Sequence, residues 1–450
     1  MAPSTPTDPY PRSSALSERM HALVPGGSHT YSKGDDQFPQ RSPRMMARAE
    51  GAYCWDADGN RFLDWAMGNR VIVLGHGHPV VNEAVKRQID IGLNFTRPGV
   101  LELELAEHLV DLWPVAEMVK FGKNGSDVTT AALKLARAAT GRTLVARCTD
   151  HPFFSIHDWF IGTTAMRAGV PPEGAKSTLG FPYGDLAAVE ALFAAHPGRI
   201  AALILEPVKN DVPPPGYLEG LRALTEREGC LLVFDEMISA IRFDLRGAHH
   251  RWGVKPDLAT FGKAIGNGFS ISVLAGRRDL MELGGIRHDR ERVFLLSQTH
   301  GSETVGLAAC LATLRECDRV DVTSHIWAVG ARLVQGIRSI AEEEGVADHV
   351  RVIGFDCNPQ LLCTRADGTY WPELTTSFHE EAIAHGVLMP WISITLAHGD
   401  EELALTFEAV RAAARKVRRA LETDSVDASF EGPPVRPVFR RFNNVWERAA

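Results

Sequence analysis

The sequence lacks the features by which several classes of protein are recognised. It has no run of about 18 apolar residues, so we expect no segment that spans a membrane. The N-terminal stretch Met1–Ser14 is polar and proline-rich and has no apolar signal core. The seven cysteines form no Cys-x-x-Cys pair, and their odd number and irregular spacing indicate reduced thiols in a cytoplasmic protein.

An excess of positive charge is also missing. Lysine and arginine number 48 against 56 aspartates and glutamates, which gives a net charge of −8. This balance argues against binding to nucleic acid or to anionic membranes. Hydrophobic residues make up 45% and charged residues 23% of the chain, which excludes a disordered protein. The 450 residues are enough for two or three domains.

The hydrophobic pattern predicts an α/β fold. Short apolar segments alternate with helical patterns between about 101 and 310, and this alternation indicates a parallel sheet covered on both faces. The predicted strands are 118–121, 143–148, 200–205, 230–234 and 258–261, and the predicted helices include 79–92, 101–112, 126–140 and 216–228. Ligands bind such sheets at the carboxyl ends of the strands, so the residues after each strand are the candidates for a site.

Three parts follow from this pattern. Residues 1–75 are expected to be a loose N-terminal arm and a segment of a small domain, and residues 76–320 a large domain with a mostly parallel sheet. Residues 321–450 change to helix, strands and helices, with helices expected at 322–344, 378–385 and 401–421. We interpret them as a smaller α+β domain. Its tail from 427 is expected to be an arm packed on its own surface or on a partner subunit.

Three strand ends carry residues suited to chemistry. Asn124, Gly125 and Ser126 lie between a strand and a helix, where free N–H groups and a hydroxyl can hold a phosphate. The same residues would also suit a plain turn and helix cap. Asp235 ends an apolar strand, where a carboxylate can pair with a cationic nitrogen, bind a metal or act as a base. Lys263 lies among glycines after a short apolar segment, and a desolvated lysine is a candidate nucleophile.

The glycines around Lys263 do not match other nucleotide-binding patterns. Residues 262–268 read Gly-Lys-Ala-Ile-Gly-Asn-Gly, which is neither a Walker A motif nor Gly-x-Gly-x-x-Gly. A phosphate cradle, a carboxylate and a nucleophilic lysine, in that order on one sheet, are together what pyridoxal 5′-phosphate (PLP) requires. The sequence therefore predicts PLP as the cofactor.

From about residue 25 to about residue 418 the sequence resembles the class III (subgroup II) aminotransferases of PLP fold-type I. Among these it is most similar to the glutamate-1-semialdehyde aminomutases. The resemblance depends on an ordered set of motifs: Pro25-Gly26-Gly27, Leu74-Gly75-His76-Gly77-His78-Pro79, Asn124-Gly125-Ser126-Asp127, Leu205-Glu206-Pro207, Phe234-Asp235-Glu236 and Lys263 in its glycine-rich segment.

The resemblance implies a role for each matching residue. Lys263 would form the Schiff base with PLP and shuttle a proton, and Asp235 would pair with the pyridinium nitrogen. Thr299 would reach the phosphate from the neighbouring subunit, which implies a homodimer with shared active sites. The remaining cofactor-binding positions are Asn124, Gly125 and Ser126 at the phosphate, with Glu206 and Met237 nearby.

Two departures from the family affect the substrate. The family's Tyr-His-Gly is replaced by Asp150-His151-Pro152, so His151 or Phe153 is expected to stack on the cofactor instead. The aminomutase arginine that binds a carboxylate is absent, and the segment from Ser28 to Lys33 offers hydroxyls and Lys33 in its place. Lysine cannot form the bidentate fork of arginine. We therefore expect an acceptor without a carboxylate, such as a sugar or aminocyclitol aldehyde of the aminoglycoside type, contacted by Tyr31 and Lys33.

Other functions remain as alternatives. The chain could be a true aminomutase, an ω-amino acid aminotransferase, or a PLP-fold protein without activity. A metal hydrolase that uses His76, His78 and Asp235 is disfavoured, because no further ligand has suitable spacing. We expect no metal, and only small molecules and a second copy of the chain as partners.

Overall fold

The computed structural model describes residues 8–443, which form two units. The first unit comprises residues 8–69, 73–78 and 324–438, and the second comprises residues 70–72, 79–323 and 439–443. Within the described residues, no helix has both the length and the apolar content needed to cross a membrane. Each unit has its own sheet and is described by itself.

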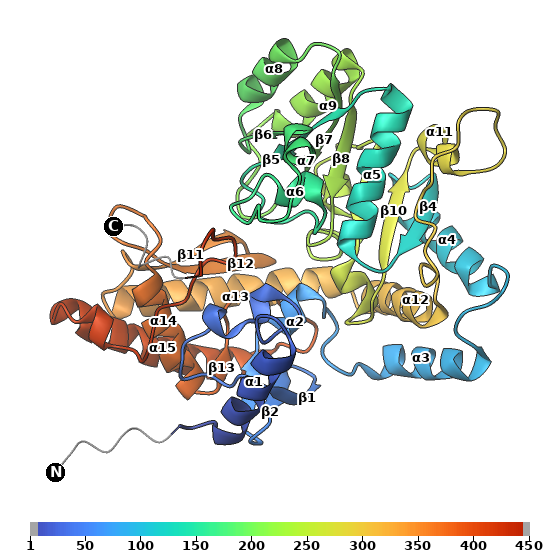
Figure 1. The fold of residues 1–450 in the computed structure, drawn as a ribbon. Helices are drawn as coiled ribbons and strands as arrows, with labels where there is room; N and C mark the ends of the chain where they lie inside the picture. The colour runs from blue at the N-terminus through green and yellow to red at the C-terminus, as the bar shows by residue number, and fades with distance from the viewer. Residues whose placement is uncertain (1–7, 444–450) are drawn as a thin grey trace. The chain divides into compact units, whose positions relative to one another are not determined.

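The second unit is built on a seven-stranded sheet in the order β4-β10-β9-β8-β7-β5-β6 (Figure 1). Strands β5 to β9 pair in parallel, whereas β10 is antiparallel to both β9 and β4. Since β10 is antiparallel to both neighbours, β4 runs in the same direction as the parallel strands. The strands are β4 (Met118–Gly122), β5 (Leu144–Cys148), β6 (Thr178–Phe181), β7 (Ile200–Leu205), β8 (Leu231–Asp235), β9 (Leu258–Phe261) and β10 (Ser272–Gly276).

Helices cover both faces of this sheet. Helix α5 (Gly125–Thr140) packs on one face, where Val145 and Ala202 join its core. Helices α8 (Leu186–Ala195) and α9 (Tyr217–Glu228) pack on the other, against their strand neighbours Ala146 and Leu203. Successive strand residues thus enter opposite cores, which explains why these strands are apolar throughout. Figure 1 shows α5 on one side of the sheet and α8 and α9 on the other.

The other long helices of this unit are α3 (Pro79–Ile91), α4 (Val100–Leu112) and α12 (Thr304–Arg319), and α12 packs against both α3 and α4. Proline begins α3, as its missing N–H permits. The short helices are α6 (Asp158–Ile161), α7 (Pro172–Lys176), α10 (Ala248–Arg251) and α11 (Arg278–Met281).

The first unit combines a four-stranded sheet, a two-stranded sheet and long helices. The four-stranded sheet has the order β1 (Met46–Glu50), β2 (Tyr53–Asp56), β3 (Arg61–Asp64) and β13 (Val387–Leu388), and β11 (Val350–Phe355) pairs with β12 (Asn358–Cys363). The helices are α1 (Pro11–Leu23), α13 (Val322–Glu343), α14 (Pro372–Ala384) and α15 (Asp400–Glu422), with the short turn α2 (Met67–Arg70).

Helix α1 corrects the expectation of a loose N-terminal arm. Its buried residues are Ser13 and Ser17, and the Ser13 hydroxyl accepts the Met45 N–H at 2.7 Å. Polar contacts rather than an apolar stripe hold this helix, so the hydrophobic pattern does not reveal it. At the other end of the chain, the Arg436 N–H donates to the Asp36 carbonyl at 2.9 Å. The tail up to residue 438 therefore belongs to the first unit and residues 439–443 belong to the second, and residues 444–450 lie outside the described chain.

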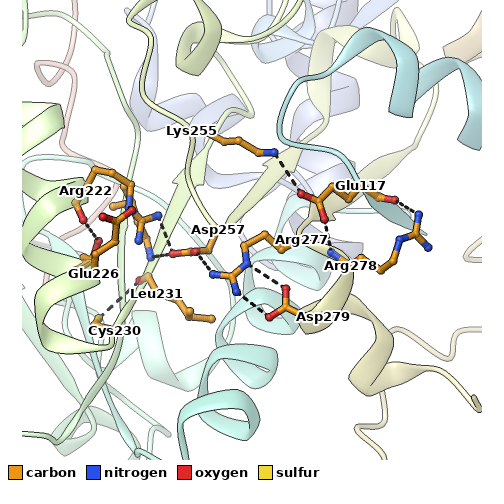
Figure 2. A network of polar contacts seen from close by, with 12 residues as sticks. Glu117, Arg222, Glu226, Cys230, Leu231, Lys255, Asp257, Arg277, Arg278 and Asp279 are labelled. Atoms are coloured by element: carbon orange, nitrogen blue, oxygen red, sulfur yellow. Dashed lines mark hydrogen bonds and ion pairs between the residues drawn. The ribbon is translucent and has the colours of Figure 1, made fainter. Parts of the chain in front are cut away.

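A polar network fixes the end of the seven-stranded sheet where β9 begins (Figure 2). Asp257 is 3% exposed and directly precedes β9. Its carboxylate accepts hydrogen bonds from Arg222 at 2.9 Å, the Leu232 N–H at 2.8 Å and Arg277 at 2.7 Å. A buried carboxylate with three donors is fully compensated. Lys263 follows the same strand at its other end, so the network is structural and separate from the candidate site.

Candidate active site

The carboxyl ends of five strands meet at one edge of the seven-stranded sheet. Since β4, β5, β7, β8 and β9 run in the same direction, the residues after them share this edge. The structure thereby places together, at that edge, most of the residues that the sequence singled out: Asn124, Gly125, Ser126, His151, Glu206, Asp235, Met237 and Lys263.

The segment after β4 is a helix N-terminus with a preformed shape. Asn124 lies at the N-cap of α5, and its N–H donates to the Asp127 carboxylate at 3.0 Å. Ser126 is buried and accepts the Ile156 N–H at 3.0 Å, so its hydroxyl still has its own proton to donate. Ser272 of β10 donates to the Asn124 carbonyl at 2.9 Å. A helix N-terminus held in this way suits a phosphate.

Met237 connects this segment to the lysine segment. A Cβ at Gly125 would lie 3.2 Å from the Met237 sulfur, and a Cβ at Gly262 would lie 2.5 Å from it. The thioether is therefore packed between the start of α5 and the residue before Lys263. The φ of Gly262 is 179°, which is extended backbone that any residue can adopt. The close approach of Met237, and not the backbone conformation, therefore favours glycine at this position.

Asp235 has one carboxylate oxygen occupied by the protein. It is 3% exposed, and its Oδ1 accepts the Met237 N–H at 3.1 Å and the Thr260 hydroxyl at 3.2 Å. Burial, followed by the nearby Glu206 carboxylate, raises the pKa of Asp235 to about 7. A cation brought to this carboxylate would restore its charged form. A protonated ring nitrogen meets that need.

Lys263 follows β9 in a left-handed backbone conformation, with φ of 50°. Burial lowers the pKa of its amine to about 8. The Glu206 and Asp235 carboxylates raise this pKa, whereas the Arg70 and Arg242 guanidinium groups lower it. A lysine with such a pKa is partly neutral near pH 7.5 and can act as a nucleophile and base.

His151 lies beside Glu206 and is held as a neutral ring. Its Nδ1 accepts the Glu206 N–H at 3.0 Å, and burial lowers the pKa of His151 to about 4. The ring therefore carries its proton on Nε2. It lies 5.3 Å from the Tyr183 ring and is buried, whereas the alternative, Phe153, is 45% exposed. The stacking role of His151 stays a prediction.

Three predicted site residues lie outside this cluster. The Thr299 carbonyl accepts a hydrogen bond from Asn94 at 3.0 Å, in a pocket also lined by residues 95–98. Its contribution to a neighbouring subunit stays a prediction. Tyr31 and Lys33 belong to the first unit, where Tyr31 is 57% exposed. Their contact with a substrate also stays a prediction.

The sequence missed a buried hydrogen-bonded pair directly after Asp235. His249 is buried, and its Nδ1 lies 2.9 Å from the Glu236 carboxylate. The Ala248 and His249 N–H groups also donate to Glu236, each at 2.8 Å. Glu236 thus fixes the backbone beyond Asp235 and is a structural residue. The two successive acidic residues, Asp235 and Glu236, could have indicated this pair, since a buried carboxylate requires partners from elsewhere in the chain.

The sequence also missed Arg70 and Lys209. Both groups interact electrostatically with Glu206, and burial lowers the pKa of each. An arginine in the apolar stretch before Leu74 and a lysine soon after a buried strand were the available signals.

A family comparison decides what this arrangement is. The model of the family "Aminotransferase class-III" matches residues 35–390. The chain belongs to the class-III aminotransferases. Its relatives include a 3-aminobutyryl-CoA aminotransferase of Cloacimonas acidaminovorans, 32% identical over 420 residues, which cover 91% of this chain and 98% of the relative. A glutamate-1-semialdehyde 2,1-aminomutase of Thermomicrobium roseum is 34% identical over 431 residues, which cover 90% and 99% of the two chains.

The solved structures agree with the fold. The FumI protein of Sphingopyxis sp. MTA144 has a TM-score of 0.84 with this chain at 26% identity, over 94% of this chain and 99% of that one. This class-III aminotransferase is therefore an enzyme of PLP fold-type I, and PLP is its cofactor. Its residues fit the cofactor, because Asp235 leaves Oδ2 without a protein hydrogen bond in the described chain and the start of α5 offers phosphate donors.

Proposed function

We propose that this class-III aminotransferase moves an amino group between a small amino donor and an aldehyde or ketone, with Lys263 as its catalytic residue. The observation that carries the proposal is that Lys263, Asp235 and the N-terminus of α5 share one sheet edge. A site that holds a phosphate, a ring nitrogen and an aldehyde needs all three.

The residues divide the chemistry among them. Bound PLP supplies an electron sink that makes the substrate C–H bond acidic. The N–H groups at Gly125 and Ser126 would bind the phosphate, and Asp235 Oδ2 would accept a hydrogen bond from the protonated ring nitrogen. Lys263 Nζ holds the cofactor and carries the proton taken from the substrate carbon. Met237, which packs close to Gly125 and Gly262, would contact the cofactor.

For the acceptor, we propose a sugar or aminocyclitol aldehyde. Support comes from the segment Tyr31-Ser32-Lys33, which has no arginine, and from the hydroxyls near it. Tyr31 is exposed, and the Ser28 hydroxyl donates to the Thr30 carbonyl at 2.9 Å. Exposed hydroxyls suit a polyhydroxylated ligand. The aminomutase remains the second candidate, favoured by the printed name of the Thermomicrobium relative.

We also propose a cytoplasmic homodimer. Support for the dimer comes from large apolar side chains that α3, α4 and their connection leave exposed. These are Val80, Ile89, Ile91, Leu93, Phe95, Val100, Leu103 and Val110. Unpaired apolar area of this kind is typical of subunit interfaces. Sedimentation analysis of the holoenzyme tests the dimer, and a monomer at micromolar concentration would contradict it.

The activity is tested by the visible spectrum of the purified holoenzyme. Glutamate, glutamine, an ω-amino acid and a 6′-amino aminoglycoside are added singly, and the yellow band of bound PLP is followed. We expect bleaching by the aminoglycoside, which is the reverse of transfer to the sugar. Bleaching by the ω-amino acid alone would favour an ω-aminotransferase. Conversion of glutamate-1-semialdehyde without consumption of a donor would favour the aminomutase.

A further inference from the structure

Arg70 ends a strained turn. Its φ is 66°, and the three preceding residues, Met67, Gly68 and Asn69, have φ values of 47°, 61° and 74°. A left-handed conformation costs a residue other than glycine about 1–2 kcal/mol. Three such residues within four positions, Met67, Asn69 and Arg70, are retained only where the surrounding structure requires their placement, and such strain clusters at functional sites.

The backbone of Arg70 is fixed against the turns that follow Asp235 and Lys263. The fully buried Arg242 donates to the Arg70 carbonyl at 2.8 Å and to the Ile238 carbonyl at 3.3 Å. Two residues on, the side chain of Ile72 lies 2.8 Å from the position of a Cβ at Gly268. Arg70 is thereby held at the carboxyl ends of β8 and β9, within the same unit as Lys263.

One nitrogen of the Arg70 guanidinium is not satisfied by the protein. Its Nε is buried and has no hydrogen-bond partner in the described chain. Arg70 interacts electrostatically with Glu206, Lys263 and Lys209, yet no carboxylate lies within 4.0 Å of it among residues 8–443. Arg70 as a whole is partly exposed, but a cation with a buried nitrogen that lacks a hydrogen bond is costly, so the site favours an anionic ligand.

We propose that Arg70 binds the carboxylate of the amino donor while its amino group lies at Lys263. The inference rests on the proposed transfer of an amino group and names the donor's class, an amino acid. A planar guanidinium matches a carboxylate through two parallel hydrogen bonds, which fixes the orientation of the substrate. Arg70 thus replaces the carboxylate-binding arginine that is missing near Lys33, and it does so from another segment.

The cofactor phosphate is a poorer partner for Arg70. We assign the phosphate to the N-terminus of α5, whose neighbours are Met237 and Ile156. Arg70 instead interacts with Glu206, which follows β7. The acceptor that we propose has no carboxylate, so the donor is the substrate that carries one.

The test compares Arg70→Gln with the wild-type holoenzyme on two matched donors, L-alanine and ethylamine, which differ by the carboxylate. Bleaching of the yellow band in single turnovers gives the rate constant and the apparent Kd for each. We expect Arg70→Gln to lose about 30-fold or more in efficiency with L-alanine and less than 3-fold with ethylamine, as for a lost charged hydrogen bond. Arg70→Lys should lie in between.

Two further measurements separate binding from structure. Succinate, which carries no amino group, should perturb the band of the wild type and not that of Arg70→Gln. Arg147→Gln is the matched control, because Arg147 is a buried arginine of the same unit that bonds Thr163 at 2.8 Å. Arg147→Gln should keep the wild-type ratio of the efficiencies with L-alanine and ethylamine.

The outcomes distinguish the two proposals. Wild-type efficiency of Arg70→Gln with L-alanine, or an equal loss with both donors, would overturn the role of Arg70 and leave the transfer of an amino group intact. A wild-type holoenzyme that no amine bleaches would overturn the proposed function itself. If Arg70→Gln does not fold, the ratio of the efficiencies with L-alanine and ethylamine is measured for Arg70→Lys instead. An intermediate ratio supports the role of Arg70, and a wild-type ratio overturns it.

Discussion

The lowered pKa of Lys263 gives a prediction that can be worked out in advance. With a pKa of about 8, roughly a quarter of the amine is neutral at about pH 7.5. An ordinary lysine, at about 10.4, has only about one neutral molecule in a thousand at that pH. At this pH the neutral, nucleophilic fraction of Lys263 is therefore on the order of 200 times larger than that of an ordinary lysine.

The assay is competitive labelling of the protein freed of PLP. Reductive methylation is run from about pH 6 to 11, with N-acetyl-lysine amide as an internal reference, and mass spectrometry of the Lys263 peptide gives the extent of reaction. We expect a midpoint near pH 8. Glu206→Gln should lower it and Arg70→Gln should raise it, because a carboxylate stabilises the ammonium and a guanidinium destabilises it.

The two variants are expected to shift the midpoint of Lys263 in opposite directions, which a general loss of structure cannot do. A general loss of structure would expose Lys263 and move both midpoints upward together. Each shift is expected to be about one pH unit, which corresponds to about 1.4 kcal/mol. A wild-type midpoint near pH 10, or two variants that shift in the same direction, would refute the reasoning.

Three further predictions test the surroundings. Asp235→Asn should bind PLP but lose most of its turnover, and near-normal rates would show that it does not pair with the ring nitrogen. Gly262→Ala should overpack Met237 by about 1–3 kcal/mol and weaken PLP binding by about 5–150-fold; fluorescence titration should show partial recovery when Met237→Ala is added. Burial raises the pKa of Glu236, but hydrogen bonds from His249 and Ser239 outweigh burial and hold this pKa below its usual value. The ionised carboxylate therefore stabilises the fold above about pH 4.5, and this contribution is lost as the pH falls through the lowered pKa. The melting temperature should fall below about pH 4.5, and Glu236→Gln should flatten that fall; an identical profile would contradict the account.

Local patterns predicted the strands that carry the site. The apolar runs at 200–205 and 230–234 are β7 and β8, because strands buried on both faces show no alternation. The antiparallel strand β10 was not predicted. It follows the glycine-rich segment after Lys263, and its five residues are too few to stand out from that irregular stretch.

Most of the site followed from order along the chain, since each strand end delivers its residue to the same edge. The charges around Lys263 did not follow in this way. Arg70 reaches Lys263 from a distant segment through a left-handed turn, and His249 reaches Glu236 through a loop that reads as polar surface. Such pairs depend on tertiary packing, which no spacing within a single segment encodes.

The central claim is that PLP binds covalently at Lys263, at the edge where the five strands end. The measurement that tests it most directly is reduction of the yellow holoenzyme with borohydride, followed by digestion and peptide mapping. The account predicts a single modified lysine, Lys263, with the mass of the reduced cofactor, and no yellow band in Lys263→Ala. A label on another lysine, or full turnover by Lys263→Ala, would contradict it.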